Sequence, residues 1–234
     1  TTWGECAIVP MNIDFIILAA GKGTRMGGDS PKVLASLAGK PLVQHLIDTV
    51  DTFQSSKTSI VVGYKSNEVE RDLVSKKKLC FVKQKNQLGT AHAVKQALPN
   101  IRKNSVAVVL YGDVPLVKKN TLNRLIKSAS TGKLSLLTFI KEDPTGYGRI
   151  IRSSKKNVQK IIEHKDASSA EKELREVNSG ILAIKANLLQ KFISKIKNNN
   201  AAKEYYLTDL VEIANNHSVD VVATLCDPYE VGGA

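Results

Sequence analysis

The strongest constraint on the fold is a regular alternation of short apolar segments with segments of helical periodicity. The first apolar segment, residues 15–20, reads Phe-Ile-Ile-Leu-Ala-Ala, which is typical of a central parallel strand covered on both faces. After a polar, glycine-containing loop, Pro41 opens a segment with apolar residues at helical spacing, and proline suits the first turn of a helix. The alternation continues to residue 140 and predicts an α/β fold with a mostly parallel central sheet.

The expected elements cover most of the chain. Further strands are expected at residues 59–62, 80–82, 106–111, 134–140, 149–152, 158–162, 180–184 and 219–224, and helices at 67–74, 90–98, 121–129, 188–196 and 208–216. Because no internal repeat or low-complexity linker divides it, we expect one domain over residues 11–234. Residues 1–10 have no clear period, and we expect them to be a leader segment outside this domain.

Composition restricts the class of protein. The sequence has neither an apolar run long enough to span a membrane nor a secretory signal, so we expect no membrane partner and a cytoplasmic location. Its three cysteines are far apart and form no Cys-x-x-Cys pair, which disfavours a disulfide framework or a zinc site. The net charge of +12 favours anionic partners. The lysine runs are not interleaved with aromatic residues, so we expect no nucleic-acid partner.

A glycine-rich loop, Gly-Lys-Gly-Thr-Arg-Met-Gly-Gly, follows the first strand at residues 21–28. Met26 stands where the dinucleotide fingerprint needs glycine, and Asp29 stands where the Walker pattern needs lysine. A hydride-transfer enzyme and a P-loop ATPase are therefore both disfavoured. Glycines let backbone amides approach an anion closely, and Arg25 and Lys32 could bring positive charge to it, which favours a triphosphate site. The alternative is a glycine-rich surface turn with incidental basic residues.

Asp113 directly follows another apolar run, residues 106–110. Ligands of open α/β sheets bind beyond the carboxyl ends of the strands, where this carboxylate is expected. Magnesium keeps several waters and takes only one or two protein carboxylates, so a single aspartate suits it. On its own, a Gly-Asp pair is more typical of a turn.

Several sequence blocks resemble the sugar-phosphate nucleotidyltransferases, in particular their N-acetylglucosamine-1-phosphate uridyltransferase branch. The likeness begins at residues 18–26 and 31–34 and continues, in the same order, through residues 87–93, 111–116, 144–150, 162–167, 177–181 and 204–209. It implies a Rossmann-like, three-layer, glycosyltransferase-A-like fold. It also implies a magnesium-dependent enzyme that converts UTP and N-acetylglucosamine 1-phosphate to UDP-N-acetylglucosamine and pyrophosphate. UDP-N-acetylglucosamine is a precursor of peptidoglycan and lipopolysaccharide.

The resemblance also implies roles for individual residues. Arg25, Lys32 and Asp113 would be catalytic, with Asp113 the magnesium ligand. The nucleotide would be held by Leu18, Ala19, Ala20, Gly21, Gln84, Gly89 and Thr90, and the sugar by Tyr111, Gly112, Gly148, Glu163 and Asn178. Without the resemblance, the last two would be read as a surface carboxylate and a turn residue. The four histidines show no metal-ligand spacing, and no catalytic role is assigned to them.

Two features of the family are expected to be missing. One is an asparagine that helps to hold the metal after a Glu-Val-x-Gly run; here the chain stops at residues 230–234, and Glu230 is not expected to replace it. The other is a left-handed β-helix acetyltransferase domain. Three alternatives stay open: a related nucleotidyltransferase for another base or acceptor, a non-catalytic nucleotide- or RNA-binding module, and an inactive fragment. A homo-oligomer is also open.

Overall fold

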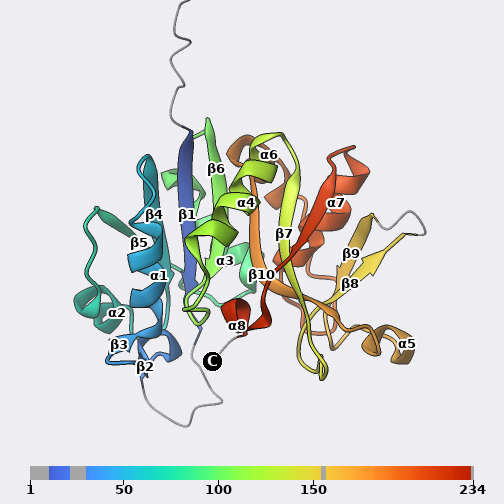
Figure 1. The fold of residues 1–234 in the computed structure, drawn as a ribbon, viewed down its shortest axis with the longest axis horizontal. Helices are drawn as coiled ribbons and strands as arrows, with labels where there is room; N and C mark the ends of the chain where they lie inside the picture. Colours follow the sequence, from blue (N-terminus) through green and yellow to red (C-terminus); the bar gives the residue numbers. More distant parts are fainter. Residues whose placement is uncertain (1–10, 22–29, 154–156, 233–234) are drawn as a thin grey trace, which may run out of the picture.

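The computed structural model describes residues 11–21, 30–153 and 157–232. A twisted β-sheet runs through the middle of the protein, and helices cover both of its faces (Figure 1). The strands are β1 (Asn12–Ala19), β2 (Ser36–Leu37), β3 (Lys40–Pro41), β4 (Ser56–Val62), β5 (Leu79–Lys83), β6 (Ser105–Tyr111), β7 (Leu134–Ile140), β8 (Arg149–Arg152), β9 (Val158–Ile162), β10 (Glu176–Lys185) and β11 (Val221–Leu225). The helices are α1 (Leu42–Val50), α2 (Ser66–Asp72), α3 (Thr90–Ala97), α4 (Lys119–Ser130), α5 (Ser169–Lys172), α6 (Ala186–Ile193), α7 (Leu210–Asn216) and α8 (Pro228–Val231), with short 3-10 turns η2 (Lys32–Leu34), η3 (Leu98–Asn100) and η4 (Leu207–Asp209).

The strand order along the main sheet is β11-β7-β10-β6-β1-β4-β5, and β8 and β9 branch from β10. β1 pairs in parallel with β4 and β6, β4 with β5, and β7 with β11. β10 runs antiparallel to both β6 and β7. The predicted α/β fold with a mostly parallel central sheet is therefore confirmed, with β10 as the strand that reverses direction.

The two faces of the sheet carry separate hydrophobic clusters. Phe15 and Ile17 of β1 belong to the cluster that includes residues of α1 and α4, whereas Ile16 belongs to the one that includes residues of α3, α6 and α7. These helices lie on opposite sides of the sheet (Figure 1). Since successive strand residues point to opposite faces, a strand covered on both sides must be apolar throughout, which accounts for the first apolar run of the sequence.

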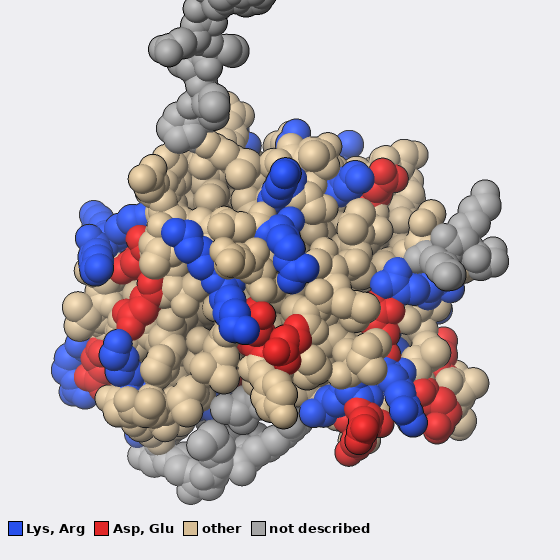
Figure 2. All heavy atoms as spheres, in the orientation of Figure 1, with Lys and Arg blue, Asp and Glu red and all other residues tan. Residues whose placement is uncertain are grey.

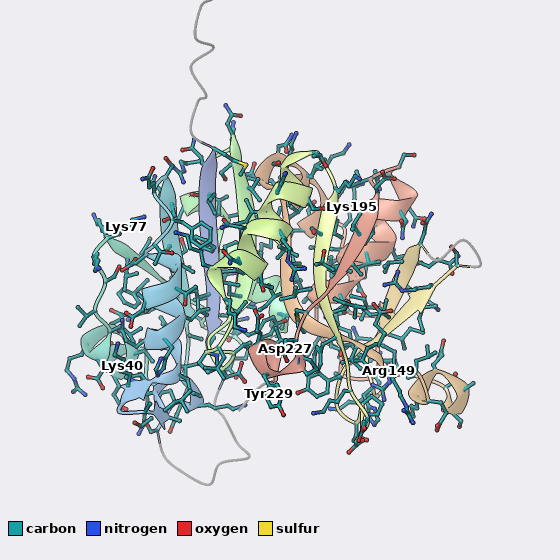
Figure 3. All side chains as sticks on the ribbon, in the orientation of Figure 1. Lys40, Lys77, Arg149, Lys195, Asp227 and Tyr229 are labelled. Atoms are coloured by element: carbon teal, nitrogen blue, oxygen red, sulfur yellow. The ribbon has the colours of Figure 1, made fainter. Side chains whose placement is uncertain are left out.

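Some elements were not predicted from the sequence. They are the β2–β3 hairpin, the short helices α5 and α8, and the first residues of β10, which begins at Glu176 rather than near residue 180. α5 begins with a capping box between Ser168 and Glu171, and the Asp227 side chain accepts a hydrogen bond from the Tyr229 amide at the start of α8. Tyr229 itself points outward and is 85% exposed (Figure 3).

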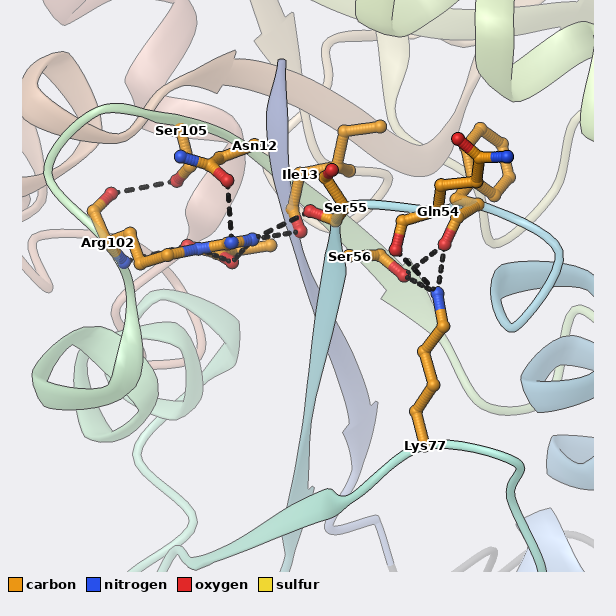
Figure 4. Close-up of polar contacts among 10 residues, drawn as sticks. Asn12, Ile13, Gln54, Ser55, Ser56, Lys77, Arg102 and Ser105 are labelled. Carbon is orange, nitrogen blue, oxygen red and sulfur yellow. Dashed lines mark hydrogen bonds and ion pairs between the residues drawn. The ribbon is translucent and has the colours of Figure 1, made fainter. Parts of the chain in front are cut away.

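Polar side chains tie the strands together at the edge of the sheet where they begin. The Asp14 carboxylate, which is fully buried, accepts hydrogen bonds from the Arg102 backbone amide at 2.7 Å and from its guanidinium Nε at 2.9 Å (Figure 4). The same guanidinium donates to the carbonyl of Ser55, just before β4. Lys77 Nζ donates to the Ser56 hydroxyl at 2.8 Å. This edge is opposite the carboxyl ends where ligands are expected.

On the face drawn in Figure 2, basic side chains are interspersed with acidic ones. None of the helices that the structure describes has the length and apolar character needed to cross a lipid bilayer.

Candidate active site

A pocket of about 310 Å³ opens at the carboxyl ends of the central strands. Its wall is formed by the end of β1, the segment after β5, the start of α3 and the end of β6. The lining residues are Leu18, Ala19, Ala20, Gly21, Lys32, Val33, Gln84, Gln87, Gly89, Thr90, Ala93, Tyr111, Asp113 and Glu204. The structure thus brings together the nucleotide-binding residues expected from the resemblance with Lys32 and Asp113.

Lys32 and Asp113 form an ion pair at this pocket, with 2.8 Å between Nζ and Oδ2. Their side chains are only 26% and 29% exposed. Gly112 permits the approach: its amide donates to the Leu18 carbonyl at 2.9 Å, and a Cβ at this position would lie 2.8 Å from Cγ1 of Val33. A side chain at residue 112 would push against Val33 of the η2 turn, which carries Lys32, so glycine favours the close contact of this turn with the end of β6.

Gln84 lies directly after β5 and is 4% exposed. Its side-chain Nε2 donates to the Gly89 carbonyl at 3.2 Å and lies 2.9 Å from Nδ1 of His92. Gly89 precedes α3 with a φ of +110°, and a Cβ there would lie 2.6 Å from the Tyr205 carbonyl oxygen. The turn between β5 and α3 therefore requires glycine, both for its backbone conformation and for the space beside residue 205.

Two polar residues of the pocket, Gln87 and Glu204, were not assigned a role from the sequence. Gln87 donates a hydrogen bond from its Nε2 to the Ala20 carbonyl, which ties the loop before α3 to the end of β1. Glu204 also lines the pocket. Both lie inside blocks that carry the family resemblance, residues 87–93 and 204–209, so the signal for them was present.

Three of the residues expected to bind the sugar, Gly148, Glu163 and Asn178, also gather in one place, whereas Gly112 packs against Leu18 and Val33. The Gly148 carbonyl accepts a hydrogen bond from the Asn178 amide at 2.9 Å, and a Cβ at Gly148 would lie 3.5 Å from both carboxylate oxygens of Glu163. The Thr208 hydroxyl donates to Glu163 at 3.0 Å. Buried Arg149, at the start of β8 (Figure 3), donates to the Lys172 carbonyl and so braces this region.

Tyr111 joins the two groups, because it lines the main pocket and also a small recess with Asn178 and Thr208. Its ring rests against Gly180, where a Cβ would lie only 2.5 Å from the ring carbon Cε2. Gly180 has a φ of +86° and lies within a register shift of β10 between Asn178 and Leu182. Bulges of this kind re-aim side chains, and this one makes room for the Tyr111 ring.

Acidic groups beside the recess have altered proton affinities. Burial raises the pKa of Glu163, against the lowering effect of the hydrogen bond from Thr208, and Asp166 and Glu204 raise it further. Burial also raises the pKa of Asp209 to about 6, with further contributions from neighbouring carboxylates. The pKa of Tyr111 is raised as well, chiefly because burial disfavours the phenolate.

Two acidic side chains line the pocket, Asp113 and Glu204, and Asp113 is the one expected to hold a divalent metal. Among the described residues, no group of three or more His, Cys, Asp or Glu side chains is arranged to hold a metal ion. The Asp113 carboxylate lines the pocket. Within the described part of the chain, its Oδ2 accepts a hydrogen bond from Lys32 and its Oδ1 accepts none. That donor set fits magnesium, which takes few protein ligands. Glu230, which was not expected to serve as a metal ligand, is buried and accepts a hydrogen bond from the Lys118 amide at 3.1 Å.

Of the site residues expected from the sequence, Arg25 lies within residues 22–29, outside the described residues. The others fall into the two adjoining groups above. Their roles stay predictions.

Comparison with known proteins identifies the family. Residues 15–175 match the MobA-like NTP transferase domain. The chain belongs to this family.

The NTP transferase domain is also similar to three proteins named "Bifunctional protein GlmU". It is 47% identical to that of Pseudomonas entomophila over 96% of this chain and 49% of that protein, 47% to that of Thiobacillus denitrificans over 89% and 45%, and 45% to that of Cellvibrio japonicus over 89% and 46%. The chain thus spans about half the length of these relatives, and the resemblance stated from the sequence blocks is confirmed.

Solved structures share the fold of this NTP transferase domain. A UDP-glucose pyrophosphorylase in complex with UDP-glucose superposes with a TM-score of 0.75 at 18% identity, over 92% of this chain and 90% of that one. A putative glucose-1-phosphate thymidylyltransferase from Bacillus anthracis gives a TM-score of 0.73 at 17% identity, over 92% and 87%. At these identities the likeness establishes the three-layer nucleotidyltransferase fold and nothing finer.

Proposed function

We propose that the protein is a nucleotidyltransferase that joins UTP to N-acetylglucosamine 1-phosphate, forming UDP-N-acetylglucosamine and pyrophosphate. One observation carries the proposal: the Lys32–Asp113 pair lines the same pocket as the end of β1 and the Gln84–Gly89 segment. The similarity to several GlmU proteins at 45–47% identity supports the choice of substrates. Residues 11–234 are proposed as one catalytic domain, acting in the cytoplasm on nucleotide and sugar-phosphate partners.

The reaction requires little proton transfer. An ionised phosphate oxygen of the sugar 1-phosphate attacks the α-phosphorus of UTP; one P–O bond forms while the bond to the leaving pyrophosphate breaks. Because the attacking oxygen is already ionised near neutral pH, neither a general base nor a covalent intermediate is needed. The protein must hold two polyanions together and stabilise the charge that develops on pyrophosphate.

The chain's own groups are arranged for this task. The Lys32 ammonium supplies positive charge at the pocket. Residues 18–21 also line the pocket, and we propose that phosphate groups come close to their backbone. Gln84 and Gly89, which line the pocket, would contact the base, and Glu163 and Asn178 would contact the sugar. Tyr111 lines both the pocket and the adjoining recess, which supports this division of roles. Asp113 would hold magnesium, which when bound neutralises phosphate charge.

The test is to mix the protein with UTP, N-acetylglucosamine 1-phosphate and magnesium and to measure pyrophosphate release. The control reactions replace UTP by CTP, ATP, GTP or dTTP, and the acceptor by glucose 1-phosphate or a methylerythritol phosphate. We expect release to be greatest with the first pair and to stop when a chelator removes the divalent ion. Greater release with another pair would reassign the substrates.

The other two alternatives are distinguished by binding measurements made beside this assay. A non-catalytic nucleotide-binding module would bind UTP in calorimetry without any release of pyrophosphate. An RNA-binding module would bind RNA with an affinity that falls steeply as salt is added. An inactive fragment would neither release pyrophosphate nor discriminate among the triphosphates.

A further inference from the structure

His92, which has no role in the reaction proposed above, contacts the residue that lies where the base would bind. It belongs to α3 and lies outside the set of residues that line the main pocket. Its Nδ1 is 2.9 Å from Nε2 of Gln84. The same Nε2 donates to the Gly89 carbonyl at 3.2 Å. A carbonyl can only accept a hydrogen bond, so it decides which end of the Gln84 amide is the NH₂ group.

This orientation in turn decides the state of the imidazole. Because an NH₂ group faces Nδ1, that nitrogen must accept, and the neutral ring then carries its proton on Nε2. Gln96 Nε2 lies 3.2 Å from Nε2 of His92, and one neutral ring cannot accept at both nitrogens. Gln96 Nε2 also lies 3.4 Å from the His92 carbonyl oxygen, beyond the usual hydrogen-bond range, whereas the 3.2 Å bond from Gln84 to the Gly89 carbonyl lies within it. The Gln84 amide is therefore the better fixed of the two, and the Gln96 amide is turned so that its oxygen accepts from the ring.

With both hydrogens of Nε2 engaged, the carbonyl oxygen Oε1 of Gln84 is the end left for a ligand. Within the described residues, neither Gln84 Oε1 nor the Gly89 amide has a hydrogen-bond partner, and both residues line the pocket. They present one acceptor beside one donor. Uracil offers the complementary pair, the N3–H donor next to a carbonyl acceptor. Cytosine offers the reverse, an acceptor at N3 next to an amino donor.

We propose that His92 is a positioning residue for base selection: by accepting from Gln84 Nε2, it keeps the Gln84 carbonyl oxygen directed at the base, so that UTP is chosen over CTP. Without this acceptor, the Gln84 amide is held at one hydrogen only and can turn over. A turned amide presents NH₂ to the base, which suits the N3 acceptor of cytosine and opposes the N3–H of uracil. The inference rests on the proposed function, because it assumes that the base binds beside Gln84.

The experiment compares variants that differ only in whether an acceptor faces Gln84. His92→Phe keeps a ring of similar size without an acceptor, and His92→Leu is a second acceptor-free variant in case the first does not fold. His92→Asn is the matched control, because its Oδ1 takes the place of Nδ1. Lys95→Ala, on the same helix, controls for changes to α3 in general. Folding of each variant is checked by circular dichroism.

The readout is kcat/KM for UTP divided by kcat/KM for CTP, with N-acetylglucosamine 1-phosphate as acceptor. We expect roughly a tenfold fall in this ratio for His92→Phe and His92→Leu, the order of effect of one unpaired buried hydrogen-bonding group. The fall should come from KM for UTP, with KM for the sugar phosphate unchanged. His92→Asn and Lys95→Ala should keep the wild-type ratio.

An unchanged ratio in both acceptor-free variants would overturn the inference, and so would an equal fall in His92→Asn, since that would mean a packing role only. Failure of the proposed function looks different, because the wild-type protein would then release no pyrophosphate. In that case calorimetric binding of UTP and CTP to the same variants, which needs no turnover, still decides the role of His92. If the ratio of UTP affinity to CTP affinity were the same in the wild type and in His92→Phe, the positioning role of His92 would be wrong.

Discussion

The Lys32 ammonium lies 2.8 Å from a carboxylate oxygen of Asp113, although 81 residues separate them in the chain. Lys32 is brought there by a 3-10 turn after the glycine-rich loop, and Asp113 by the end of β6. Side chains of this exposure gain little stability from pairing. The pair is therefore explained better by what it offers a ligand, namely one positive charge and one oxygen donor at the same pocket.

Replacing either partner should abolish activity while the fold persists. We expect Lys32→Ala and Asp113→Ala each to lower kcat by roughly a hundredfold or more, because charge that stabilises the transition state is lost. Pyrophosphate release measures the activity, and circular dichroism verifies the fold. Lys40→Ala is the control: Lys40 forms a similar 2.8 Å pair with Asp48, but on the β2–β3 side of the protein (Figure 3). Full activity in both site variants would remove the assignment.

Asp209 should make stability depend on pH. Its pKa is raised from an ordinary 3.8 to about 6, first by burial and then by the nearby carboxylates of Glu212 and Glu163. The folded protein therefore holds this proton more tightly than the unfolded chain does. The stability it contributes is complete below about pH 4 and is lost as the pH rises through about 6.

Asp209→Asn cannot ionise, so its stability relative to the wild type should increase across that range. Urea unfolding at about pH 4.5, 6 and 7.5 would measure the difference. Asp220→Asn removes the same formal charge from an exposed position and serves as the control. A difference for Asp209→Asn that stays constant with pH would contradict the shifted pKa.

Gly89→Ala should be more damaging than its conformation alone predicts. Gly89 and Gly132 both have a positive φ, +110° and +95°, but a Cβ at Gly132 would meet nothing within 4 Å, whereas one at Gly89 would strike the Tyr205 backbone. We expect Gly132→Ala to cost about 1–2 kcal/mol of unfolding free energy from the backbone alone. Gly89→Ala should cost more and also raise KM for UTP. Equal costs in urea unfolding would mean that residue 205 moves aside freely.

The buried Asp14 carboxylate should depend strongly on Arg102. Arg102→Ala removes its charged partner, so we expect a loss of about 3–5 kcal/mol in the free energy of unfolding. KM for UTP should not change, because the Arg102 contacts in Figure 4 are with Asn12 and Ser55 at the starts of β1 and β4, whereas the pocket lies at the carboxyl ends of the strands. Arg71→Ala, which breaks an exposed pair with Asp72, should change stability little. A large effect on KM would show that the two edges are coupled.

Much of the fold could be predicted because its determinants are local. The apolar run of β1 and the helical spacing of α1 each depend on residues close together in the chain. The strand end that carries Asp113 was predictable for the same reason. Signals for α5 and α8 were present in Ser168 and Asp227, as helix caps, but short helices have too few periodic positions to stand out.

Other relationships arise only when distant segments pack. Periodicity states which residues are buried, but not which strand is the neighbour, so the insertion of β10 between β6 and β7 could not be read from it. That insertion places Gly180 against Tyr111 and joins the two halves of the site. The contact between Gln84 and His92 depends in turn on the path of the loop around Gly89.

By itself, the sequence determined the class of fold, the order of most strands and helices, and the segments that carry the site, because hydrophobic pattern, glycine conformation and the position of a residue at a strand end act over short stretches of chain. Only the tertiary structure decided which side chains meet: Lys32 with Asp113, Gly180 with Tyr111, and His92 with Gln84. The physical reason is that these distances are set by how the strands pair and how the helices pack on them, and a one-dimensional pattern does not contain that arrangement.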